Sequence, residues 1–139
     1  RNGLNPAQLQ LEITETAAIA RLSEAREFIQ RLQRTGVHFA LDDFGSGMSS
    51  FGYLKQLPVN YLKIDGSFVK DITRDPQDRA FVEAINSVAH SMGMGTVAEF
   101  VEDDAILKVL KQIGVDHAQG YGIARPAPLH ELLLCAVDE

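Results

Sequence analysis

The sequence predicts an α/β fold of the TIM-type (β/α)8 barrel class. Two patterns indicate this class: short apolar strand segments alternate with helical segments, and nearly every strand segment ends on an acidic or amide residue. Strands separated by helices pair in parallel, and right-handed crossovers then leave an open sheet or a barrel. An open sheet usually binds its ligand at one switch point. Functional groups at almost all of the strand ends therefore favour the closed ring.

Five segments of the chain are expected to form strands. They cover residues 9–15, 37–43, 61–65, 96–99 and 115–118. In a parallel fold the strand ends point the same way, so residues far apart in the sequence converge on one face. The residues at these ends are Glu12, Glu15, Asp42, Asp43, Lys63, Asp65, Glu99 and Gln119.

Helical segments separate the strands. Residues 23–35 place apolar side chains at helical spacing, and Gly36 follows as a C-terminal stop. Asp75 and Pro76 start the next long helix, with an N-cap acid and a proline at the first helical position. The side chains that this helix is expected to bury are Phe81, Ala84, Ile85, Val88 and Met92.

Two further helical segments complete five strand–helix units. Residues 105–113 repeat the helical pattern before Gly114, and a last helix begins near Leu129. A full barrel needs eight units and typically about 250 residues, whereas this chain has 139. Residues 1–139 are therefore expected to be the C-terminal portion of one barrel domain. They would carry its last five βα units and lack its first three strands.

Composition excludes several classes of function. The net charge of −6 argues against a nucleic-acid polymer or an anionic membrane as partner. No apolar run approaches the about 18 residues that indicate a membrane span. A single cysteine, Cys135, excludes an internal disulfide and fits a reducing compartment, so a cytoplasmic location is expected. Cys135 lies in an apolar stretch, which predicts a buried and inert thiol.

The Asp42-Asp43 pair is the sharpest local signal for chemistry. Adjacent carboxylates at a strand end can serve two metal ions, and hard oxygen ligands favour Mg²⁺, Mn²⁺ or Ca²⁺ over zinc. The alternative is one aspartate that caps a turn beside another that is solvated. Four carboxylates brought together without cations would repel one another. The pattern therefore favours a divalent metal site and a metallohydrolase.

The remaining charged residues at the strand ends leave alternatives open. Glu12 and Glu15 are three residues apart, so they face opposite ways in a regular strand. One of them is expected to be a ligand, and the other a support or a helix N-terminal acid. Glu99 and Glu102 present the same ambiguity. Lys63 lies between apolar residues, where it is costly unless carboxylates surround it, and there it could orient or activate a water.

The histidines give no sign of a catalytic role. His38, His90, His117 and His130 show no metal-ligand spacing. His38 and His117 are expected to pack within strands, and His90 to lie on the polar face of its helix. No Ser/His/Asp or Cys/His arrangement is evident, which argues against covalent nucleophilic catalysis.

Five stretches of the sequence resemble successive signatures of the EAL domain family, in the order that the family has them. These stretches read LEITE from Leu11, DDFGSGMSS from Asp42, LKID from Leu62, VAEFVE from Val97 and QGY from Gln119. EAL domains are barrel phosphodiesterases that convert the bacterial second messenger cyclic di-GMP to linear pGpG with two Mg²⁺ or Mn²⁺ ions. The resemblance implies the same fold, cofactors and reaction for the domain to which this chain belongs.

The resemblance also implies a ligand set for the metals. Glu12 would bind the first metal, and Asp42 would bridge both metals. Asp43 and Glu99 would bind the second. The Glu-Ala-Leu signature and an asparagine ligand would lie before Arg1, so this chain alone is expected to be inactive.

Other residues receive supporting roles from the resemblance. Lys63 and Gln119 would position the attacking water, and Glu102 would support the cluster. Glu15, together with Ser49, would hold the loop of residues 42–50 in its active shape.

The resemblance also suggests partners. The loop of residues 42–50 borders the dimer contact in the family, which implies a homodimer through this region. A diguanylate cyclase-like domain is expected beside the barrel in the parent protein. The alternative is a non-catalytic cyclic di-GMP receptor that signals through dimerisation. Ser46, Met48 and Phe100 replace the more common Thr, Tyr and Gly of the family.

Overall fold

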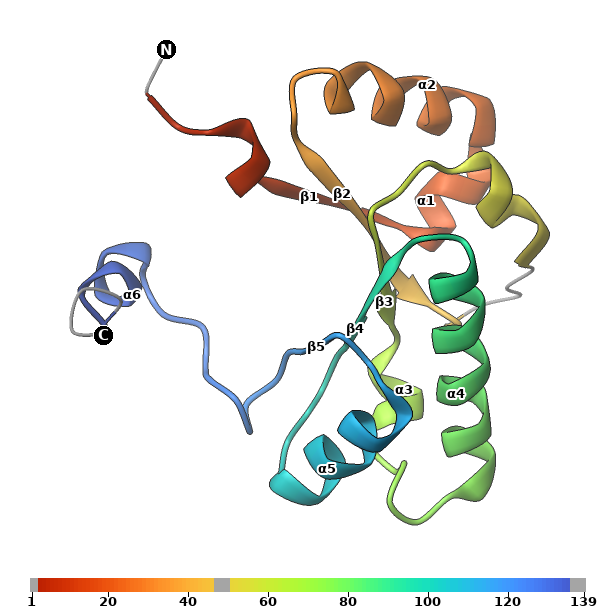
Figure 1. Cartoon of the computed structure of the whole chain (residues 1–139), viewed down its shortest axis with the longest axis vertical. Helices are drawn as coiled ribbons and strands as arrows, with labels where there is room; N and C mark the ends of the chain where they lie inside the picture. Colours follow the sequence, from red (N-terminus) through yellow and green to blue (C-terminus); the bar gives the residue numbers. More distant parts are fainter. Residues whose placement is uncertain (1–2, 47–50, 136–139) are drawn as a thin grey trace.

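The computed structural model describes residues 3–46 and 51–135, with side chains described as far as residue 132. One parallel sheet forms the centre of the structure (Figure 1). Its strands, in spatial order, are β1 (Gln10–Thr14), β2 (His38–Phe44), β3 (Tyr61–Ile64), β4 (Gly95–Ala98) and β5 (His117–Ala118). The helices are α1 (Glu15–Ala20), α2 (Leu22–Gln33), α3 (Gly66–Val69), α4 (Pro76–Ser91), α5 (Asp104–Ile113) and α6 (Leu129–Cys135). The 3-10 turns are η1 (Pro6–Gln8) and η2 (Phe51–Gln56).

The order β1-β2-β3-β4-β5 confirms the predicted run of consecutive parallel βα units. Neighbours in the sheet are neighbours in the sequence, which is the arrangement found in a (β/α)8 barrel. The five described strands form an open sheet with β1 and β5 at its edges. Several strands are shorter than predicted, because Glu15 already belongs to α1 and only two residues of β5 pair with β4.

The two faces of the sheet differ in character. One face is apolar and packs under α1, α2 and α4, which lie on the same side of the strands (Figure 1). Its buried side chains include Phe39, Leu41, Leu62 and Ile64. Because side chains alternate along a strand, the opposite face receives the polar residues of the same strands. The hydrophobic core therefore lies on the helix side, and the charged residues gather on the other side.

The buried side of α4 agrees with the prediction at Ile85, which is buried, and at Val88 and Met92, which pack partly buried against the core, and it differs at Phe81 and Ala84. Asp75 caps the helix by accepting hydrogen bonds from the N–H groups of Gln77 and Asp78, as expected. The side chains in the core are Val82, Ile85 and Ala89, whereas Phe81 is 53% exposed. Ala84 is also exposed. Helical spacing leaves the rotation of the helix undetermined, and the Phe81 ring lies at the edge of the buried stripe against Phe68.

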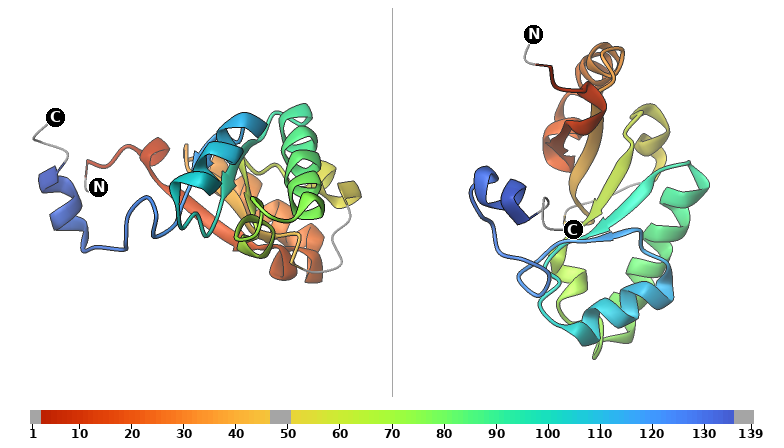
Figure 2. Two further views of the ribbon diagram at one scale, coloured as in Figure 1. Left: turned by 90° about the horizontal axis from the view of Figure 1, so that it is seen from below. Right: turned by 60° about the vertical axis from the view of Figure 1, so that its left-hand side comes forward.

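The C-terminal helix α6 stands apart from the sheet and its covering helices in both views (Figure 2). It begins at Leu129, as predicted. The side chain of Cys135 lies outside the described part of the chain, so the prediction of a buried thiol there is not tested. Among residues 3–46 and 51–135, no helix combines the length and apolarity needed to cross a membrane.

Candidate metal centre and active site

Lys63 lies at the centre of a cluster of carboxylates at the carboxyl ends of β1 to β4. Its Nζ is 2.9 Å from Glu12 Oε1, 3.1 Å from Glu99 Oε1 and 3.4 Å from Asp42 Oδ1. Lys63 is only 3% exposed, so these carboxylates, in place of water, stabilise the charge of its ammonium group. The structure therefore confirms the expectation that a lysine on this buried strand is surrounded by carboxylates.

The charges in the cluster influence one another strongly. Burial favours the neutral form of Lys63, but hydrogen bonds to Glu12 and Glu99 outweigh it and raise the pKa of the ammonium group. Burial raises the pKa of Glu99 to about 7, Asp42 adds to this effect, and Lys63 opposes it. Lys63 is thus a permanent cation, and the carboxylates beside it carry more negative charge than one lysine neutralises.

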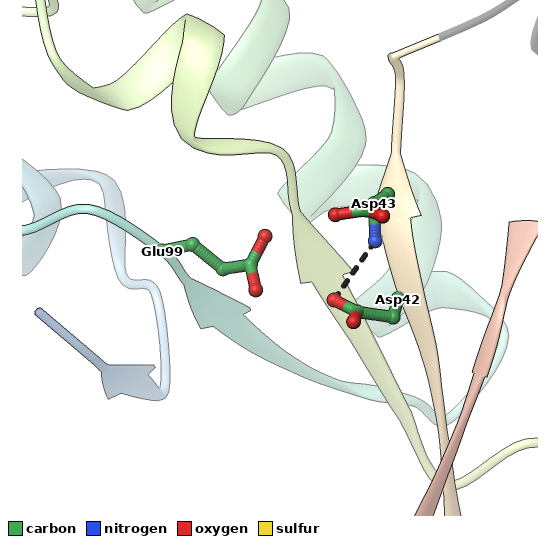
Figure 3. Close-up of side chains that lie close together, drawn as sticks. All are labelled: Asp42, Asp43 and Glu99. Atoms are coloured by element: carbon green, nitrogen blue, oxygen red, sulfur yellow. Dashed lines mark hydrogen bonds between the residues drawn. The ribbon is translucent and has the colours of Figure 1, made fainter. Parts of the chain in front are cut away.

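A second group of carboxylates overlaps the first. One oxygen from each of Asp42, Asp43 and Glu99 lies within 4.8 Å of the others. Figure 3 shows Asp42 on β2 and Glu99 just after β4, with their carboxylates facing one another across the end of β3. Within the described part of the chain, this is the group of acidic, histidine or cysteine residues that could hold a metal ion. Its hard oxygen donors fit Mg²⁺ or Mn²⁺.

A bulge in β2 brings the two adjacent aspartates to the same side. Leu41 pairs with Leu62, and Phe44 pairs with Ile64, so two residues of β2 lie opposite Lys63 alone. Asp43 has a left-handed φ of +56°, and its N–H donates a hydrogen bond of 2.9 Å to Asp42 Oδ1 (Figure 3). In a regular strand the two side chains would face opposite ways. The bulge removes this restriction and lets both carboxylates reach one site.

Glu15 occupies a different position from the other acids. It is the first residue of α1 and is 3% exposed. Its Oε2 accepts a hydrogen bond of 3.1 Å from the Gly45 N–H, and its Oε1 accepts one from the Tyr53 hydroxyl. Glu15 therefore contacts the segment that follows the metal candidates, which is the segment that the family resemblance assigned to it. Ser49, predicted to support the same loop, lies outside the described residues.

Gln119 and Glu102 line a hollow beside the acid cluster. The hollow has a volume of about 300 Å³ and is bordered by Glu99, Phe100, Glu102, Gln119, Gly120 and Tyr121. The Gln119 N–H donates to the Ala98 carbonyl at 2.8 Å, which fixes this residue to the end of β4. A side chain at position 120 would place its Cβ 2.3 Å from the Val101 nitrogen, so this close approach requires glycine. The described contacts of Lys63 do not include Gln119 or Glu102.

His38, His90 and His117 lie at the other end of the sheet, and His130 lies on α6. The rings of His38 and His117 flank Tyr61 at centroid distances of 6.5 and 5.6 Å. His90 on α4 lies 2.7 Å from Asp116. The expectation of an exposed helix histidine is confirmed at His90, and of the two strand histidines His38 is partly buried, whereas His117 is exposed against Tyr61.

Sequence reasoning missed two contributors to the site: the bulge in β2 and the hydroxyl of Tyr53. The bulge exists because β2 has two residues where β3 has one between the same two paired positions. The sequence of one strand does not reveal its pairing with the next. The one available signal was the pair of glycines, Gly45 and Gly47, that follow the aspartates. Glycines permit a left-handed backbone, which indicates that the strand ends irregularly.

Fold and site together define an α/β protein of the barrel class with an acidic, lysine-centred cluster at the carboxyl ends of its strands. A family model described as the EAL domain matches residues 1–126, and the chain belongs to the EAL domain family. The family assignment from the sequence motifs is thereby confirmed.

Known proteins agree with this assignment. "Cyclic di-GMP phosphodiesterase PdeB" from Shewanella oneidensis is 52% identical over 118 residues, which is 85% of this chain and 14% of PdeB. The structure titled "PaMucR Phosphodiesterase, c-di-GMP complex" is 37% identical with a TM-score of 0.88, covering 95% of this chain and 53% of that one. In Pseudomonas aeruginosa, MucR is named a bifunctional diguanylate cyclase/cyclic di-GMP phosphodiesterase.

A metal-containing relative has the same fold. The manganese/cyclic di-GMP complex of Klebsiella pneumoniae BlrP1 is 31% identical with a TM-score of 0.84, covering 90% of this chain and 32% of that one. This chain thus spans less than two thirds of each of these relatives.

Proposed function

We propose that this chain supplies the catalytic face of a domain that hydrolyses cyclic di-GMP to linear pGpG. The observation that carries the proposal is Lys63, held by Glu12, Asp42 and Glu99 at the same strand ends as the candidate metal ligands. The names of PdeB and MucR and the ligand in the MucR structure support this substrate.

The residues present fit two divalent ions, which we propose to be Mg²⁺ or Mn²⁺. Glu12 and Asp42 would hold one ion, and Asp42, Asp43 and Glu99 would hold the other. Bound metal would lower the pKa of a water ligand and stabilise the attacking and leaving oxygens of phosphodiester hydrolysis. The manganese complex of BlrP1 supports this choice of cofactor.

The proposed roles of the other residues follow from their positions. The Lys63 ammonium carries three donors and would orient the attacking water while it offsets part of the negative charge of the neighbouring acids. Gln119 would assist from the edge of the hollow, and Glu102 would support the cluster from its rim. Glu15 would hold the segment that follows Asp43 in place.

We further propose the setting in which this chain acts. Residues 1–139 would form the C-terminal portion of one EAL barrel, and sequence outside this chain would supply the Glu-Ala-Leu signature and the asparagine ligand. The domain would form a homodimer through the region of residues 42–50. It would lie in the cytoplasm beside a diguanylate cyclase-like domain, an arrangement that the name of MucR supports.

Product analysis with cyclic di-GMP and Mn²⁺ tests the proposed reaction. The samples are the complete EAL domain containing this chain, its Lys63→Ala variant, and the 139-residue chain alone. We expect pGpG from the complete domain, a rate lower by roughly a hundredfold or more in the variant, and no turnover by the chain alone. Lys111→Ala, which changes an exposed lysine of α5, is the control and should keep its rate.

The other outcomes are equally informative. Binding of cyclic di-GMP without turnover by the complete domain would favour a receptor over an enzyme. An undiminished rate in Lys63→Ala, or turnover by the chain alone, would contradict the mechanism.

A further inference from the structure

The Glu15 carboxylate connects two segments that lie on either side of residues 47–50 in the sequence. One of its oxygens accepts a hydrogen bond from the Gly45 N–H, and the other accepts one from the hydroxyl of Tyr53 in η2. Because Glu15 is 3% exposed, water does not readily replace either donor. A buried carboxylate is costly when an oxygen lacks a partner. The Tyr53 hydroxyl therefore determines whether Glu15 can hold Gly45 with its other oxygen.

We propose that Tyr53 is a positioning residue of the candidate metal centre, which acts on Asp43 through Glu15 and Gly45. The inference rests on the function proposed above, since the position of Asp43 affects turnover only if the acid cluster binds catalytic metal. Tyr53 itself is not among the residues that touch the cluster.

The backbone between Asp43 and Gly45 explains why such a constraint is needed. Asp43 has a φ of +56° and Gly45 a φ of +98°. A left-handed conformation costs energy for a residue with a side chain, less for aspartate than for most, and surrounding contacts help to hold it. The Ser46 N–H donates to the Asp43 carbonyl at 3.2 Å, and the Gly45 N–H is held by Glu15. Loss of the second bond removes one constraint that comes from outside this turn, and the Asp65 N–H bond to the Phe44 carbonyl at 3.1 Å remains.

Tyr53 is suited to this role because its ring and its hydroxyl have separate functions. The ring packs near the buried Phe44 ring at a centroid distance of 6.4 Å. Burial and the adjacent Glu15 carboxylate raise the pKa of the Tyr53 hydroxyl, so it stays a donor at working pH. Replacing Tyr53 by phenylalanine thus removes the hydrogen bond and leaves the ring packing in place.

The test compares Tyr53→Phe with Tyr61→Phe in the complete EAL domain. Tyr61 lies at the other end of the sheet between two histidine rings, so its variant is a matched control for loss of a hydroxyl. We expect kcat for cyclic di-GMP to fall by about tenfold or more in Tyr53→Phe, as for loss of a hydrogen bond to a charged group. KM should change little, and half-maximal activity should need more Mn²⁺. Tyr61→Phe should resemble the wild type in all three.

A second measurement does not depend on turnover. Amide hydrogen exchange at Gly45 should be faster in Tyr53→Phe by about tenfold, while the melting temperature should fall by only several degrees relative to Tyr61→Phe. Adding Glu15→Gln to Tyr53→Phe should cause little further loss, because both changes break the same connection. Unchanged exchange at Gly45 together with unchanged Mn²⁺ dependence would overturn the proposal. If the wild-type domain lacks turnover, the proposed function fails, and exchange at Gly45 still decides the role of Tyr53.

Discussion

At the scale of single residues, Lys63 supplies part of the positive charge that the clustered acids require. The sequence argument held that four carboxylates cannot gather without cations. The structure shows one cation from the chain itself, in contact with Glu12, Asp42 and Glu99. Desolvation and the Asp42 charge raise the pKa of Asp43, so the ionised form of Asp43 is disfavoured. The cluster is therefore still short of positive charge near Asp43, where a divalent ion would bind.

We predict that the chain alone binds Mn²⁺ weakly and at one site. Asp42, Asp43 and Glu99 offer one oxygen each, whereas Mg²⁺ and related ions favour about six ligands. Lys63 also competes for two of these carboxylates. Titration calorimetry should show weak binding that Asp43→Asn removes and Asp104→Asn, at the exposed start of α5, leaves unchanged. Two tight sites per chain would contradict the proposed ligand set.

Much of the residue-level site could be predicted from sequence because one physical rule applies to it. The ends of parallel strands converge, so Glu12, Asp42, Lys63 and Glu99 had to lie close together. Tyr53 followed no such rule. It reaches Glu15 through a hydrogen bond between η2 and the first residue of α1, and neither segment's own sequence pattern encodes that contact.

At the scale of elements, Asp116 connects three of them. Its Oδ2 accepts from the Thr96 N–H of β4 at 2.8 Å and lies 2.7 Å from His90 Nε2 of α4. Asp116 itself precedes β5, which leads to Gln119. Burial favours the neutral acid, but the bonds from His90 and Thr96 outweigh it and lower the pKa of Asp116. The network thus fixes the edge strand against the helix that covers it.

This network predicts a dependence of stability on pH. Because the pKa of Asp116 is lower in the folded state, its stabilisation is fully present above its ordinary value of 3.8 and is lost as pH falls through the folded value. Asp116→Asn should cost about 1 kcal/mol near pH 7, and the difference from wild type should shrink below pH ~4. Thermal melts at several pH values measure this, with Glu27→Gln on the exposed side of α2 as control. A difference that does not vary with pH would refute the assignment.

The elements also show where periodicity stops being informative. Asp75 and Pro76 correctly predicted the start of α4, and Gly114 correctly predicted the end of α5. Helix caps can be predicted in this way because they depend on local chemistry. The buried stripe of α4 was predicted correctly at Ile85 and wrongly at Phe81, beside which Val82 is buried instead. A helix records the spacing of its apolar residues, whereas the sheet beneath it determines which of them face the core.

At the scale of the whole molecule, the sheet is covered on one face and has two unpaired edges among its described strands. β1 and β5 are the edges, and Glu12 of β1 and His117 of β5 are exposed. Unpaired strand edges favour association with other chains. A barrel avoids this because its ring has no edge.

We therefore predict that the chain alone self-associates as its concentration rises, whereas the complete domain does not form aggregates through its sheet. Light scattering coupled to size-exclusion chromatography over a wide range of concentrations measures this. Introducing a proline at Gln10 of β1 should reduce association, because proline cannot donate a ladder hydrogen bond. The Gln10 N–H faces the open edge, since the Leu9 carbonyl of the same peptide accepts from His38 of β2. A monomer at all concentrations would show that the edges are protected in another way.

The bulge in β2 has a consequence for how such a domain can change over time. Leu41 and Phe44 keep their pairing with β3 on either side of it, so removal of one aspartate would leave a regular strand with Phe44 still in the core. A deletion of one codon would thus take away a ligand without disturbing the hydrophobic interior. Chemistry and folding are separable at this point by a change in residue count alone. A domain with this bulge is thus one codon deletion away from a chain that keeps its strand pairing and loses a candidate metal ligand.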